Sequence, residues 1–201
     1  MLKGEPLKAA FETWVLTCGL RDAVEVLNVF LERARMAAAS YSLWEEFRIP
    51  GTRDARVPSG EWNTKIVGGV DKFHRLGLPD KLERLTKYSP TLAPGLGDEV
   101  RAINQARNCL VHRGGTVTER DSNSPDGLVV KWEKVSLEID GPSGRQPLRP
   151  PQYVAEGGNL VMNYHRTSKL FRLGESVTFS AQEFAELCMT FVRFGNELCA
   201  S

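Results

Sequence analysis

The hydrophobic positions near the N-terminus recur at steps of three and four residues, which predicts a helix over 7–39. A first apolar stripe consists of Leu7, Phe11, Trp14 and Cys18. A second stripe, after Gly19, consists of Leu20, Val24, Leu27 and Leu31. Successive helical residues are rotated by about 100°, so the two stripes lie on different faces. We therefore expect either a helix that breaks at Gly19 or one long helix that is buried on two sides in a bundle.

Further helices are predicted downstream. Apolar periodicity indicates a helix over 63–76, and Pro79 suits the first position of the next one. Asp98 begins another helix, because acidic residues favour the positive end of the helix dipole. Ser180 begins the last helix, since Ser180 and Glu183 have the spacing of a capping box.

The pattern changes after Thr116. Apolar and polar residues alternate in short runs, which is typical of strands. We expect strands at 128–132, 134–140, 159–164 and 176–179, and a proline- and glycine-rich loop at 141–152. The chain is thus expected to be mainly α and a single domain, 1–201. A helical bundle would be formed by 1–116 plus 180–201, with a small β-rich insertion, 117–179, before the C-terminal helix.

Composition describes an ordinary globular protein, with 41% hydrophobic and 25% charged residues. The formal net charge of +1 supplies no global field toward nucleic acid, so any such binding needs a local patch. Charged residues break up the first 19 positions, and no apolar run approaches the ~18 residues of a membrane span. The four cysteines are widely spaced in apolar segments, which predicts buried, reduced thiols. We expect a cytoplasmic protein that requires no metal and no cofactor.

The helix that runs into Gly114 and Gly115 carries Arg107, Asn108 and His112 near its end. Arginine is a permanent cation whose forked donors match a phosphate. Histidine exchanges protons near neutral pH. The two together suit cleavage of a phosphodiester bond without a metal, and the glycines leave space for a substrate backbone.

The sequence Asn-Gln-Ala-Arg-Asn-Cys-Leu-Val-His-Arg-Gly-Gly at 104–115 resembles the signature of HEPN domains. That signature is an arginine, usually followed by a polar residue, with a histidine four to six positions later in the same helix. The resemblance implies a HEPN-like helical bundle that dimerises. For active members it also implies a metal-independent endoribonuclease, often a toxin of a toxin–antitoxin pair or an anti-phage defence effector.

Residues five apart are about 140° apart around a regular helix, so Arg107 and His112 do not share a face. They could converge through the reach of arginine and a distorted last turn, or two chains could place their motifs opposite each other across a two-fold axis. We expect a homodimer that binds RNA, with Arg107, His112 and Asn108 catalytic. Arg101 and Arg113 are candidate phosphate contacts. A cognate antitoxin or defence-system partner is a further expected partner, and a membrane is not.

Other readings stay open. The motif residues could serve structure alone, Arg107 as an interior ion-pair residue and His112 as a helix cap. A catalytically inactive dimeric module could use the same cleft to bind a nucleotide, an RNA or a partner protein. The β insertion could instead be the functional part, and it contains a basic and aromatic cluster that could contact RNA. That cluster comprises Tyr164, His165, Arg166, Lys169, Phe171 and Arg172.

Overall fold

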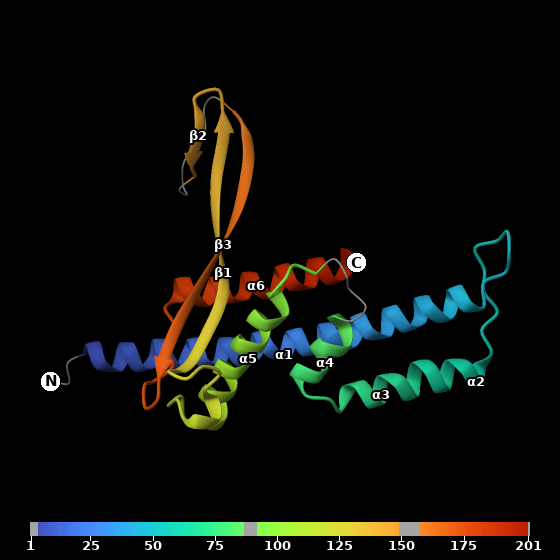
Figure 1. Ribbon diagram of the computed structural model, residues 1–201, viewed down its shortest axis with the longest axis horizontal. Coiled ribbons are helices and arrows are strands. Elements are labelled where there is room, and N and C mark those ends of the chain that lie inside the picture. The colour runs from blue at the N-terminus through green and yellow to red at the C-terminus, as the bar shows by residue number, and fades with distance from the viewer. Residues whose placement is uncertain (1–3, 87–91, 149–156, 201) are drawn as a thin grey trace. The chain divides into compact units, whose positions relative to one another are not determined.

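The computed structural model describes residues 4–86, 92–148 and 157–200 (Figure 1). The helices in chain order are α1 (Gly4–Glu46), α2 (Ser59–Glu61), a π-helix η1 (Trp62–Val67), α3 (Gly68–His74), α4 (Leu78–Thr86), α5 (Leu96–His112), a 3-10 helix η2 (Glu119–Asp121) and α6 (Ala181–Ala200). The strands are β1 (Gly127–Gly141), β2 (Gly144–Pro147) and β3 (Asn159–Arg172).

The chain divides into two compact units. The first contains residues 1–20 and 98–193, and therefore the sheet, most of α5 and most of α6. The second contains residues 21–97 and 194–201. Helix α1 belongs to the first unit up to Leu20 and to the second from Arg21 onward.

Helix α1 is continuous, and Gly19 does not break it. A Cβ atom at Gly19 would lie 2.9 Å from the Phe184 ring, so the missing side chain lets Phe184 pack against the helix. The second stripe is buried, as expected: Leu20, Val24, Leu27 and Leu31. The expected burial of the first stripe is wrong. Its large members are exposed: Leu7 by 77%, Phe11 by 61% and Trp14 by 61%.

In the second unit, α2, η1 and α3 form one helical run alongside the C-terminal half of α1 (Figure 1). Lys65 on this run donates to both carboxylate oxygens of Glu46, at 2.9 and 2.8 Å. The core of this unit includes buried apolar side chains from α1, η1, α3, α4 and the start of α5: Leu43, Ile66, Phe73, Leu78, Leu82, Leu85 and Leu96. Lys81 is also buried there, and its ammonium group donates to Glu32 at 2.8 Å.

The sheet of the first unit is antiparallel, with the strand order β2-β1-β3. Strands β1 and β3 pair over the whole length of β3, from Gly127 opposite Arg172 to Asp140 opposite Asn159. β1 has 15 residues and β3 has 14, so the expectation of a HEPN-like bundle with a small β-rich insertion is wrong. Helices still predominate, but the β part is a large hairpin that shares a compact unit with most of α5 and most of α6.

Other strand boundaries also differ from the expected ones. The strand expected at 159–164 continues to Arg172 as β3. The segments 128–132 and 134–140 are parts of one strand, β1. The expected loop over 141–152 contains β2, and its residues 149–152 lie outside the described residues. The segment 176–179 is not a strand: within the described part of the chain, its strand-like pairing is limited to an isolated bridge between Ser176 and Thr116.

The apolar positions of β1 change face partway along the strand. Leu128, Val130 and Trp132 are buried, and all three are even-numbered. Beyond Lys134 the apolar residues are odd-numbered: Val135, Leu137 and Ile139. Successive strand residues point to opposite faces, so these two runs lie on different faces of the ribbon. This change of face explains why the sequence pattern resembled two strands.

No helix in the described ranges has the combination of length and hydrophobicity needed to cross a membrane. The expectation of buried cysteines holds for Cys109 alone. Cys18 and Cys188 are half-buried, and Cys199 is exposed.

Candidate functional site

Helix α5 carries the motif on a firmly packed scaffold. Its buried stripe contains Val100, Ile103 and Ala106, each fully inaccessible to solvent. Asp98 and Glu99 lie in the first turn, where their charges favour the helix dipole. The helix ends at His112, and the next turn contains two glycines with left-handed backbone.

The end of α5 is closed by backbone hydrogen bonds. The amides of Arg113 and Gly115 both donate to the Cys109 carbonyl, at 3.1 and 3.0 Å. Gly114 and Gly115 have φ values of +65° and +78°, a conformation that strains residues with a Cβ atom. The Gly115 carbonyl then accepts from the Val177 amide at 2.8 Å. The turn after His112 is therefore anchored to the segment that follows β3.

Arg107, Asn108 and His112 come together within one chain. The Nη1 atom of Arg107 donates to Oδ1 of Asn108 at 3.0 Å and lies 3.3 Å from Nε2 of His112. A guanidinium group has donors only, so in this arrangement Nε2 accepts and the imidazole proton is assigned to Nδ1. The length of the arginine side chain spans the angular gap, and contact between the two residues does not require a second chain.

The three side chains differ in exposure. His112 is exposed, whereas Arg107 and Asn108 are half-buried. A fixed cation thus lies next to an accessible imidazole that can accept or release a proton. This combination can bind a phosphate and transfer a proton to or from a neighbouring oxygen.

Arg113, a candidate phosphate contact, is engaged elsewhere. Its Nε donates to Oδ1 of Asp121 at 2.6 Å. Asp121 is completely buried, and its other oxygen accepts from the amide and hydroxyl of Thr118 at 2.9 and 2.8 Å. Burial alone would raise the pKa of Asp121, but the hydrogen bonds from Arg113 and Thr118 hold that pKa below its ordinary value. Arg101, the second candidate, donates to Asp98 at 2.6 Å.

Sequence reasoning missed Asp121, although a signal for it was present. Thr118 and Asp121 have the spacing of a capping box, and they form one at the start of η2. The backbone carbonyl of Asp121 also accepts from the Gln105 side chain at 3.0 Å. Asp121 therefore ties η2 both to the middle of α5 and, through Arg113, to its end.

The basic and aromatic cluster of β3 is largely engaged in internal contacts. Arg166 pairs with Glu99 at 3.3 Å, and Lys169 donates to Glu183 at 2.9 Å. The Tyr164 ring lies under the Arg193 guanidinium, at 4.5 Å, and Phe171 is buried. His165 is exposed, and its Nε2 lies 2.9 Å from the Ser136 hydroxyl.

After Asp121, Glu99 is a second charged group that was not among the site residues predicted from the sequence. It is the ion-pair partner of Arg166. Its carboxylate is buried, and its Oε2 has no hydrogen-bond partner among the residues that the structure describes. Burial raises the pKa of Glu99, and the nearby charge of Glu133 raises it further. Arg193 forms an ion pair with Glu133, so two carboxylates and two guanidinium groups meet where β1 and β3 pass α5 and α6.

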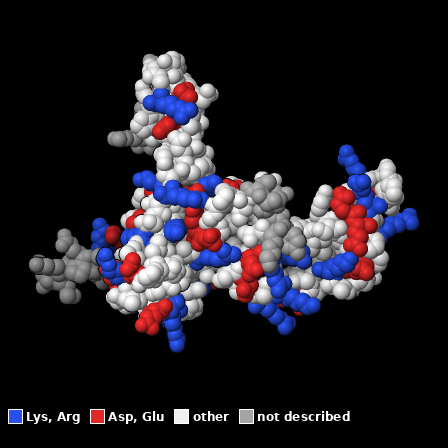
Figure 2. All heavy atoms as spheres, viewed as in Figure 1, with Lys and Arg blue, Asp and Glu red and all other residues white. Residues whose placement is uncertain are grey.

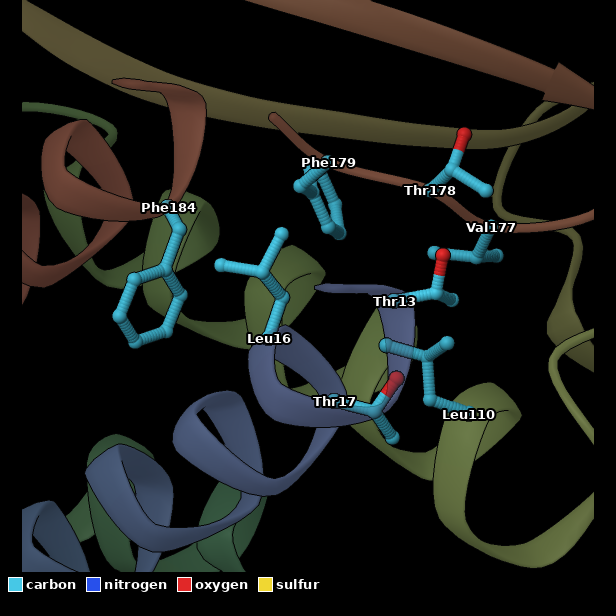
Figure 3. A pocket seen from close by; sticks show the side chains of 8 residues that line it. All are labelled: Thr13, Leu16, Thr17, Leu110, Val177, Thr178, Phe179 and Phe184. Atoms are coloured by element: carbon cyan, nitrogen blue, oxygen red, sulfur yellow. The ribbon is translucent and has the colours of Figure 1, made fainter. Parts of the chain in front are cut away.

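Figure 3 shows a small apolar pocket in the first unit. Its lining residues are Thr13, Leu16, Thr17, Leu110, Val177, Thr178, Phe179 and Phe184. None of the three motif residues lines it, so the motif site is an exposed helix end rather than part of this pocket. Among the described residues, no group of three or more histidine, cysteine or acidic side chains is arranged to hold a metal ion.

Comparisons with protein-family models, with curated proteins and with solved structures found no match to this chain. The resemblance to HEPN domains therefore depends on residues 104–115 alone.

Proposed function

We propose that this chain is a metal-independent endoribonuclease that acts in the cytoplasm, with Arg107 and His112 as its reacting groups. The observation that carries the proposal is the 3.3 Å contact between Arg107 Nη1 and His112 Nε2 at the exposed end of α5. A guanidinium group and an imidazole at this separation fit one phosphodiester linkage and its neighbouring hydroxyl.

In the proposed reaction, the ribose 2′-oxygen attacks phosphorus, and the bond from phosphorus to the 5′-oxygen breaks. A proton leaves the 2′-hydroxyl and a proton reaches the 5′-oxygen, which gives a 2′,3′-cyclic phosphate and a 5′-hydroxyl. His112 serves as the base or the acid in this transfer, which contributes ~10²–10⁴-fold to the rate. Arg107 stabilises the negative charge that gathers on the phosphate oxygens.

The resting contact between the two residues has a consequence for binding. Nε2 of His112 is occupied by Arg107, so substrate must separate them before that nitrogen can exchange a proton with RNA. A phosphate of the substrate can separate the two residues, because a guanidinium group binds an anion more strongly than it binds a neutral imidazole. Asn108 holds the same Nη1 atom at 3.0 Å and so positions the cation during this exchange.

The test is incubation of purified protein with a single-stranded RNA in the presence of a chelator. We expect cleavage to persist, to leave cyclic phosphate ends, and to be absent on DNA, which lacks the 2′-hydroxyl. His112→Ala and Arg107→Ala should each lower the rate at least ~100-fold. Matched controls are His74→Ala and Arg53→Ala, at exposed positions in the second unit.

RNA binding without cleavage would overturn the enzymatic proposal and identify an inactive binding module. Undiminished cleavage by the Arg107→Ala, His112→Ala double variant would rule out the mechanism. Expression in a bacterial host tests the toxin role: the intact chain should slow growth, and His112→Ala should relieve the effect.

A further inference from the structure

The far end of the β hairpin forms an arm that stands clear of α5 (Figure 1). We define the distal arm as β2 together with residues 134–141 of β1 and 159–165 of β3. One face of the distal arm is apolar, through three cross-strand pairs. These pairs are Val135 with Tyr164, Leu137 with Met162, and Ile139 with Leu160. The opposite face is mostly polar: it contains Ser136, Glu138, Asp140, Asn159 and Asn163, together with the apolar Val161.

This apolar face is exposed. Leu160 is 57% exposed, Met162 51% and Tyr164 44%. An antiparallel sheet with one apolar and one polar face normally packs its apolar face against other protein. Six apolar residues in adjacent pairs therefore indicate an interaction surface.

The outer edge of β3 is a second feature of the distal arm. Because the strand order is β2-β1-β3, no strand within the described ranges pairs with the outer edge of β3. Natural edge strands are usually protected by charged residues, proline or bulges. The segment Asn159–Tyr164 contains no charged residue, no proline and no glycine. Figure 2 shows charged side chains near the tip of the arm and at its base, with an uncharged stretch between them.

We propose that the outer edge of β3 pairs antiparallel with β3 of a second copy of this chain, about a two-fold axis that passes beside Met162. Residues directly opposite in an antiparallel pair lie on the same face. A pairing centred on Met162 places Leu160 opposite Tyr164 of the partner subunit and Met162 opposite Met162 of the partner subunit. The three apolar-face residues of the segment, Leu160, Met162 and Tyr164, then each meet an apolar residue, whereas Val161, on the other face, lies opposite Asn163 of the partner subunit.

Neighbouring two-fold registers match the apolar face less completely. Centring the pair on Asn163 would place Leu160 opposite Arg166 of the partner subunit, and centring it on Val161 would place Tyr164 opposite Gly158 of the partner subunit. In the Met162 register, Arg166 instead falls opposite Gly158 of the partner subunit, where no side chain opposes it. The net charge of +1 per chain adds little repulsion between copies. The apolar face of the segment is thus complementary to itself, which favours a second copy over an unrelated strand.

The resulting assembly would be a continuous six-stranded sheet, in which the apolar faces of the two distal arms lie side by side on the same face of the sheet. This inference is independent of the proposed nuclease activity, because it uses neither Arg107 nor His112. The proposed cleavage site lies on α5 and the proposed dimer edge lies on β3, so an experiment can refute either proposal without refuting the other.

The first experiment measures the oligomeric state by sedimentation velocity over a range of protein concentrations. We expect the unmodified chain to dimerise and Met162→Lys to raise the dissociation constant by roughly 100-fold or more, because two lysines would oppose each other at the axis. The matched control is Leu173→Lys, at a 52% exposed leucine just beyond β3. Circular dichroism establishes that both variants are folded. A monomeric parent chain, or a dimer that Met162→Lys leaves intact, would overturn the proposal.

The second experiment tests the register by disulfide formation in a Cys199→Ser background, which removes the exposed native thiol. Met162→Cys should cross-link to itself, since opposed residues in a sheet have Cα atoms at disulfide distance. Leu160→Cys and Tyr164→Cys should each cross-link poorly alone, because the identical residues lie four positions apart along the paired strands. A mixture of these two variants should cross-link efficiently. Equal self-cross-linking by Leu160→Cys and Met162→Cys would contradict the register.

Discussion

Replacement of Asp121 by asparagine should destabilise the protein strongly, although the two side chains have the same shape. The buried carboxylate accepts hydrogen bonds from Arg113 Nε and from both the amide and the hydroxyl of Thr118. In either orientation, the NH₂ group of asparagine would point at one of the groups that donate to the carboxylate in the parent chain. It also leaves the Arg113 guanidinium without its opposite charge.

The expected cost follows from these contacts. Loss of one member of a buried ion pair costs about 3–5 kcal/mol, and the part of Arg113 that water reaches lowers this figure. Loss of the capping box adds about 0.5–2 kcal/mol. Since asparagine retains one acceptor, we expect a loss of about 2–4 kcal/mol in the free energy of unfolding at pH 7, and a melting temperature lower by roughly 5–15 °C.

The assay is urea unfolding followed by circular dichroism at several pH values. The pKa of Asp121 is lowered in the folded state, so its contribution to stability is present above the unfolded-state pKa of about 3.9 and is lost as pH falls through the folded-state pKa. The difference between the parent chain and Asp121→Asn should therefore shrink in acid. Glu119→Gln, at an exposed acid in the same 3-10 helix, should change stability by less than about 0.5 kcal/mol. A difference below 0.5 kcal/mol for Asp121→Asn at pH 7, or one that grows in acid, would refute the reasoning.

Three other outcomes are expected. Glu99→Gln should stabilise the protein by about 1 kcal/mol at pH 7 in urea unfolding, because it removes a buried charge whose Oε2 has no partner among the described residues. Since the pKa of Glu99 is raised in the folded state, this gain in stability should vanish near pH 4, and a gain that persists there would contradict the cause. Gly115→Ala should lower the free energy of unfolding by about 1–2 kcal/mol in the same assay, and by more than Gly114→Ala does. Both glycines have positive φ, but only a Cβ atom at Gly115 would press on a neighbour, Leu110 at 3.3 Å, so equal costs would refute the steric explanation. Burial raises the pKa of the Cys109 thiol to about 11, so a thiol reagent at pH 8 should label the exposed Cys199 well before it labels Cys109, as mass spectrometry of the labelled peptides can show.

The helices were the more predictable part of the fold. Periodicity placed α5 and its end, and the capping box of Ser180 and Glu183 forms as expected, with the Glu183 amide donating to Ser180 at 3.1 Å. The single strand β1 was not predictable, because alternation identifies a strand only while the same face stays apolar. Gly19 was ambiguous for a related reason: its role depends on Phe184, which is distant in sequence.

The motif residues could be named from the sequence, but their arrangement could not. The 140° separation between Arg107 and His112 refers to backbone directions, whereas the contact forms at the far end of a long, flexible side chain. The partner of Arg113 could not be assigned either, because Asp121 reaches it through a turn of irregular structure. The roles of Arg101 and Arg113 as phosphate contacts stay predictions.

The change of face along β1 constrains how this hairpin can vary in length. Two residues, Glu133 and Lys134, separate the apolar runs that end at Trp132 and begin at Val135. Loss of either one would bring both runs into phase and turn the outer run toward the side that carries Trp132. Because the strands pair without a break, such a loss in β1 alone would also force a bulge in β3. Natural insertions and deletions here should therefore occur as whole two-residue repeats matched on both strands, while the turn between β1 and β2 should tolerate single-residue changes.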